Sequence, residues 1–194
     1  MARFPKHAAL VKIALAELGV RESPWGSNTG PRIREYQAAT WLAGTGFPWC
    51  VAFWVWAALQ AKFVLSWRGA GAYAALDWAK SVGWAVPLSG AVPGDAVVWN
   101  IGAGHLSILA EPWRPGGMVK TIDGNSSDQV ISRVRNPALV RGCVHLPEKA
   151  TKVTARPPMF EVVSSESGHR IIYVSGARAV GRNIARILRD NADT

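Results

Sequence analysis

The hydrophobic pattern of the chain changes its period near residue 95. Before that point, apolar residues recur at helical spacing in four segments, residues 6–19, 31–39, 50–63 and 72–81. After it, they alternate as in strands over five segments, about 95–100, 104–111, 117–123, 131–135 and 140–146. Helices followed by strands indicate an α+β fold, because a parallel sheet would need the two to alternate. We therefore expect N-terminal helices packed on an antiparallel sheet of about five strands.

A proline-containing stretch divides the chain after residue 150. Residues 151–158 are typical of a linker. Beyond them, 159–163 and 170–174 alternate like a hairpin closed through Ser167-Gly168, and 177–189 has helical spacing. We therefore predict three parts, a main domain over 1–150, a linker over 151–158 and a small ββα segment over 159–194.

Charge and hydropathy narrow the class of protein. The chain has 194 residues, 49% of them apolar, which suffices for one ordinary core. Its net charge of +9 attracts polyanions such as nucleic acid, anionic lipid or cell-wall polymers, and the charge alone does not decide among these partners.

No apolar run approaches the length of about 18 residues that spans a bilayer. Lys12 and Glu17 interrupt the first apolar segment, so it indicates an amphipathic helix rather than a secretion signal.

The two cysteines have different settings. Cys50 follows a turn, Gly44 to Pro48, and opens an apolar helical run. The free amides and the dipole of a helix N-terminus favour an anion, and the thiolate is the reactive form of cysteine. Cys143 lies within a predicted strand and is expected to be a small buried hydrophobe. Nothing in the sequence supports a disulfide between them.

Three polar residues complete a possible thiol-dependent site. A thiolate nucleophile works with an imidazole that moves the proton and a polar group that orients the ring. His105 opens one predicted strand, while Asp123 and Asn125 stand at the end of the next. Either of these two could orient His105, and both could equally be turn residues, because Asp-Gly-Asn is a good turn sequence.

Four segments together resemble the successive blocks of CHAP domains, the cysteine, histidine-dependent amidohydrolase/peptidase domains of phage endolysins and bacterial cell-wall hydrolases. They are Phe47–Trp56, Pro93–Trp99, Gly104–Ile108 and Ile122–Asn125. The loop over 19–28 is also similar to the one before the nucleophile in such endolysins. The resemblance covers about residues 8–147 and implies a papain-like α+β fold.

The resemblance also implies an activity. It makes Cys50 the nucleophile and His105 the general base for cleavage of an amide bond in peptidoglycan, with Asp123 where the family more often has Glu. The bond is either one cut by an endopeptidase or the one cut by an N-acetylmuramoyl-L-alanine amidase. No cofactor is implied. Some members bind calcium through aspartates before the nucleophile, but residues 19–49 contain none, so we predict no calcium site.

Aromatic and polar residues near these blocks are candidates for substrate binding. Trp49 adjoins Cys50 and is the first candidate for a groove wall, with Trp113 and Trp25 as further surfaces on which a sugar ring could stack. Glu22 and Asn28 are the polar candidates in the preceding loop. The three histidines that remain show no metal-ligand spacing along the chain, so we predict no metal site among His7, His145 and His169.

These observations favour a monomeric phage endolysin, made in the host cytoplasm without a signal peptide and acting on the wall after release. Its basic surface would hold anionic cell-envelope polymers, and residues 159–194 would either bind the wall or dock on the catalytic domain. An antibacterial effector amidase shares the same chemistry. A non-catalytic wall-binding or phage structural module is the alternative from another class. Charge alone suggests a nucleic-acid binder, and the sequence has no nucleic-acid motif.

Overall fold

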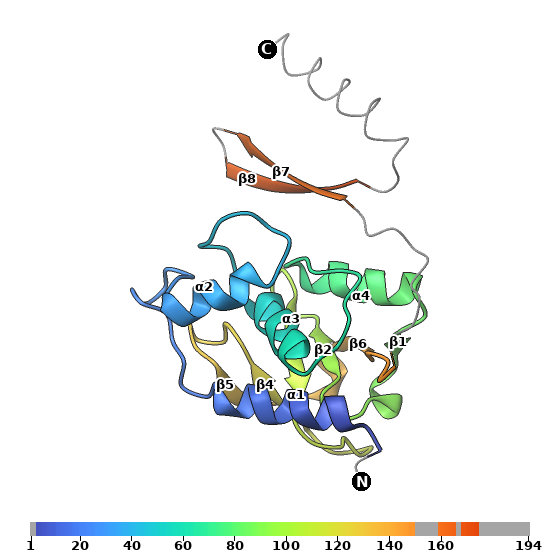
Figure 1. Cartoon of the computed structure of the whole chain (residues 1–194). Helices are drawn as coiled ribbons and strands as arrows, with labels where there is room; N and C mark the ends of the chain where they lie inside the picture. The colour runs from blue at the N-terminus through green and yellow to red at the C-terminus, as the bar shows by residue number, and fades with distance from the viewer. Residues whose placement is uncertain (1–2, 150–158, 166–167, 175–194) are drawn as a thin grey trace. The chain divides into compact units, whose positions relative to one another are not determined.

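The computed structural model describes residues 3–149, 159–165 and 168–174. The chain divides into two compact units, Met1–Lys152 and Val153–Thr194. In the first, four helices pack on a six-stranded antiparallel sheet, and the second contains a two-stranded hairpin. The predicted α+β class is therefore confirmed for the first unit (Figure 1).

The four helices precede the sheet in the chain. They are α1 Pro5–Ala16, α2 Pro31–Ala38, α3 Cys50–Gln60 and α4 Ala72–Ser81. Proline opens α1 and α2, a position where its missing N–H costs no intrahelical hydrogen bond. Helix α3 is apolar on all sides, and such a helix is stable only when it is covered all round. It lies at the centre of the first unit, in contact with the other three helices and with the sheet (Figure 1).

Six strands form one open sheet. They are β1 Ala85–Val86, β2 Ala96–Trp99, β3 His105–Leu109, β4 Val119–Asp123, β5 Ile131–Arg135 and β6 Val140–Val144. Every neighbouring pair is antiparallel, in the order β1-β6-β2-β3-β4-β5. Five of them correspond to the predicted strands. The sequence did not indicate β1, because two residues are too few to show an alternation.

The central strands are buried on both faces. One face carries a cluster of fully buried side chains, namely Val97, Trp99, Leu109, Val119 and Cys143. Partly buried side chains cover this cluster, among them Leu88 in the short 3-10 helix η1, Leu88–Gly90. The alternate residues Leu106 and Ile108 of β3 are also fully buried, on the face opposite. Polar side chains on these strands therefore reach solvent only near the strand ends. A site formed by these strands is for this reason expected at their ends.

The second unit contains strands β7 Met159–Ser165 and β8 Gly168–Val174, which pair antiparallel with Met159 opposite Val174. This is the predicted hairpin. Its turn, the predicted linker over 151–158 and the predicted helix over 177–189 lie outside the described residues. Among the described residues, no helix has the length and hydrophobicity needed to span a bilayer.

Candidate active site

Cys50 is the first residue of helix α3, as the sequence predicts. The helix begins there because an apolar run follows a loop with two glycines at positive φ, Gly44 and Gly46. The side chain is almost buried, with 7% of the residue exposed. The amides of the first helical turn have no intrahelical partner, so they offer donors beside the thiol. The position suits a nucleophile whose charge must be stabilised without bulk water.

His105 is the first residue of β3 and lies close to both Cys50 and Asp123. Its Nε2 is 2.8 Å from Asp123 Oδ2. Because Asp123 takes Nε2, Nδ1 is the ring nitrogen left for the thiol. Burial alone would lower the pKa of His105, but hydrogen bonds with Asp123 and with Cys50 outweigh it and raise the pKa to about 9. The imidazolium is therefore the favoured form of this ring at neutral pH.

Asp123, the last residue of β4, is fully buried and held on both oxygens. Thr121 Oγ1 donates to Oδ1 at 2.6 Å, and Arg135 Nη1 lies 2.6 Å from Oδ2. Burial alone would raise the pKa of Asp123. The hydrogen bond with His105 and the charges of His105 and Arg135 outweigh burial, so the pKa lies below its ordinary value. The carboxyl group is thus kept ionised and in place to hold the imidazole ring.

The topology brings these residues together. Strands β3 and β4 are antiparallel with Ile108 opposite Ile122, so the start of β3 lies beside the end of β4. Gly124 then lets helix α3 approach the turn that follows, since a Cβ there would stand 2.6 Å from Phe53 Cβ. Only a glycine allows the helix that carries Cys50 to pack this closely against the turn.

Asn125 does not contact His105 and belongs to a second network. In the amide orientation that satisfies its neighbours, Asn125 donates to Glu22 Oε1 at 3.3 Å and accepts the backbone N–H of Trp49 at 3.0 Å. Glu22 is 3% exposed and accepts from Trp49 Nε1 at 2.8 Å and from the Asn28 backbone N–H at 2.7 Å. The four residues join the loop before the nucleophile to the turn after Asp123.

The predicted substrate-binding residues differ in what they expose. The ring of Trp49 is fully buried, so in this conformation it offers no face for stacking and serves to hold Glu22. Asn28 is half-buried. Trp25 is exposed to solvent. Trp113 is half-buried and donates to the Gly117 carbonyl at 2.8 Å.

The neighbourhood of Trp113 is separate from Cys50 and His105. Trp113 lines a shallow hollow whose walls come from the segments around β1 and β6, namely Pro87, Leu88, Ser89, Pro137, Val140, Arg141 and Gly142. Neither Cys50 nor His105 is part of that wall. A role for Trp113 in binding substrate at Cys50 therefore remains a prediction from the sequence.

Sequence reasoning missed two residues that hold the carboxylate, Thr121 and Arg135. The available signal was the strand period, because Thr121 and Asp123 are two apart and share a face of β4. Arg135 sits on the neighbouring strand β5. The other cysteine, Cys143, is fully buried and free, and burial, reinforced by the charge of Asp95, raises its pKa to about 12. Cys143 thus has the inert setting predicted for it.

Comparisons of the chain with models of protein families, with curated proteins and with solved structures found no match. Neither the papain-like assignment nor an activity follows from relatives.

Proposed function

We propose that the chain is a cysteine-dependent peptidoglycan hydrolase with a papain-like catalytic domain of the CHAP type, acting as a phage endolysin. One observation carries the proposal. A nearly buried thiol at a helix N-terminus, an imidazole and an ionised carboxylate form a continuous row, Cys50, His105 and Asp123. This is the set of groups that thiol-dependent acyl transfer requires.

In the resting site the proton of Cys50 already lies on His105 Nδ1, so the reaction begins from a thiolate–imidazolium pair. The raised pKa of His105 favours the resulting imidazolium. The thiolate attacks the acyl carbon of the scissile amide and forms a tetrahedral oxyanion, which the backbone N–H of Cys50 is placed to stabilise. One such donor is worth about 3 kcal/mol in the transition state.

Two proton transfers complete the cycle. The imidazolium of His105 gives its proton to the departing amine, and a thioester on Cys50 remains. His105 then takes a proton from water, the hydroxyl adds to the thioester, and the carboxylic acid product leaves as the thiol is restored. Asp123 accepts a hydrogen bond from Nε2–H throughout and so keeps Nδ1 directed at the reacting atoms.

Peptidoglycan is proposed as substrate from the CHAP-like blocks and from the net charge of +9, which favours adhesion to an anionic envelope. Attachment of this electrostatic kind weakens as ionic strength rises. An endopeptidase and a muramoyl–alanine amidase would use the same three residues. The bond that is cut therefore depends on the substrate groove rather than on the reacting groups.

The test is mass spectrometry of purified peptidoglycan after digestion by the wild-type chain and by Cys50→Ala. New muropeptide ends that disappear in Cys50→Ala are expected, and their masses identify the bond. Cys143→Ala is the matched control, since it removes the other buried cysteine and should keep the activity. Folded wild-type protein that binds walls of several types and produces no new ends would replace this proposal with a non-catalytic binding module.

A further inference from the structure

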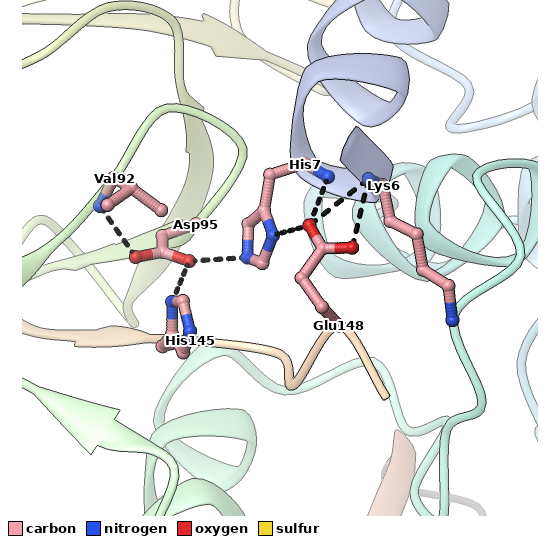
Figure 2. A network of polar contacts seen from close by, with 6 residues as sticks. All are labelled: Lys6, His7, Val92, Asp95, His145 and Glu148. Atoms are coloured by element: carbon pink, nitrogen blue, oxygen red, sulfur yellow. Dashed lines mark hydrogen bonds and ion pairs between the residues drawn. The ribbon is translucent and has the colours of Figure 1, made fainter. Parts of the chain in front are cut away.

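Three ligand-type side chains from distant parts of the chain converge at the N-terminal end of helix α1 (Figure 2). His7 lies in the first turn of α1, Asp95 just precedes β2, and His145 directly follows β6. His7 Nε2 is 3.0 Å and His145 Nδ1 is 2.9 Å from the same oxygen, Asp95 Oδ1. The three atoms all lie within 4.8 Å of one another.

Glu148 sets the orientation of the His7 ring through the other ring nitrogen, Nδ1. Nδ1 faces Glu148 Oε1 at 2.9 Å, and Glu148 also accepts the backbone N–H groups of Lys6 and His7 (Figure 2). A carboxylate only accepts when ionised, so Nδ1 carries a proton, and Nε2 is the nitrogen of His7 that a metal ion would bind. Carboxylates that hold the outer nitrogen of a histidine in this way are typical of metal-bound histidines.

Nε2 of His7 lacks a hydrogen-bond partner. The side chain is 1% exposed, and Nε2 approaches Asp95 Oδ1 without the alignment of a hydrogen bond. A lone pair that faces a carboxylate oxygen in a dry environment is unfavourable. Burial opposes a second proton on His7, but the carboxylates of Asp95 and Glu148 outweigh burial, favour that proton and raise the pKa of His7. The proton would still lack the alignment of a hydrogen bond with Asp95 Oδ1. His145 Nδ1 shares a hydrogen bond with Asp95 Oδ1 at 2.9 Å. A cation among the three atoms would take the place of that bond and give Nε2 of His7 a partner.

The spacing suits a metal of the zinc class. Tetrahedral zinc with ligand bonds of about 2.0–2.2 Å separates its ligand atoms by about 3.3–3.6 Å, so each His–Asp pair needs to open by about 0.3–0.7 Å. Asp95 Oδ2 accepts the Val92 N–H at 2.8 Å, and Oδ1, which faces both histidines, is the oxygen that the ion would bind. The side chain of His145 is 29% exposed, so an ion can reach the group from solvent.

We propose that His7, Asp95 and His145 bind one divalent transition-metal ion of the zinc class, with Glu148 as the group that orients His7. This proposal differs from the prediction made from spacing along the sequence, that His7 and His145 are not ligands. The ion would join α1, the start of β2 and the segment after β6. Neither cysteine belongs to this group, so the proposed role is structural and independent of the reaction at Cys50.

The test uses the full chain without an affinity tag, because a polyhistidine tag would bind the probe. The protein is loaded with Zn²⁺, desalted and analysed for metal content, and Co²⁺ is titrated while its visible absorption is followed. One equivalent of metal, a tetrahedral Co²⁺ spectrum and a Tm that rises with Zn²⁺ are expected. His145→Gln should lose the bound metal, and Glu148→Gln should weaken affinity about 10- to 100-fold.

Cys50→Ala and His105→Gln are the matched controls, because the Cys50–His105–Asp123 row also contains metal ligands. Both should still bind one equivalent. Metal content that is absent from folded wild-type protein, unchanged in His145→Gln, or lost in Cys50→Ala would overturn the proposal. Failure at this site leaves the proposed hydrolase untouched, because the muropeptide assay does not depend on these residues.

Discussion

Replacing His105 by Gln should change how the stability of the fold depends on pH. The folded pKa of His105 is about 9 and its ordinary value is 6.5. The difference corresponds to about 3 kcal/mol in favour of the folded imidazolium, at about 1.4 kcal/mol for each pH unit. Because the folded pKa is the higher one, this stabilisation is fully present below pH 6.5. It is lost as the pH rises through about 9.

Urea denaturation followed by tryptophan fluorescence at a series of pH values measures the effect. The free energy of unfolding of wild type minus that of His105→Gln should fall by about 3 kcal/mol between pH 6 and pH 10. Any constant difference between the two proteins reflects packing and does not enter the comparison. A difference that stays flat across this range would refute the ion-pair geometry assigned to His105 and Asp123.

Four further substitutions test the site. Asp123→Asn should lower kcat by at least about 100-fold, because it removes the charge that holds the imidazolium. Asn125→Ala should change kcat less. Steady-state assays with soluble peptidoglycan measure both effects. Gly124→Ala should cost about 1–3 kcal/mol in urea denaturation, because the new methyl group meets Phe53, and an unchanged midpoint would show that the helix approaches less closely. Cys143→Ala should cost about 1 kcal/mol and keep full activity, and a loss of turnover in folded protein would assign Cys143 a role that its burial denies.

The fold was predictable wherever a segment was long and periodic. The four helices and five of the strands correspond to predicted segments, since each stands out from the loops around it by its hydrophobic pattern. Strand β1, Ala85–Val86, is held by pairing with β6 rather than by any pattern of its own. Its existence depends on a partner more than 50 residues away in the chain, which local sequence does not reveal.

Side-chain direction was harder to predict than position. Trp49 adjoins Cys50 in sequence and was predicted to line a groove, yet its indole N–H bonds to buried Glu22 and turns the ring inward. The reason is that a buried carboxylate needs donors, and this demand comes from a loop far from Trp49 in the chain.

Contacts between distant segments explain what sequence spacing missed. His7, Asp95 and His145 show no motif because each comes from a different segment, and only the folded chain brings the start of α1, the residue before β2 and the residue after β6 together. By contrast, the neighbourhood of His105 and Asp123 follows from two adjacent antiparallel strands. Short-range topology can be inferred from sequence order, whereas the convergence of three separate segments requires the folded structure.

The most direct test of the central claim is the rate at which iodoacetamide alkylates Cys50 at neutral pH, measured by peptide mass spectrometry in wild type and in His105→Gln. A thiol activated by the imidazolium should react at least about 10-fold faster in wild type, while fully buried Cys143 stays unmodified in both proteins. Equal rates at Cys50 in two folded proteins would contradict the proposed thiolate–imidazolium pair and, with it, the assignment of the reaction to this site.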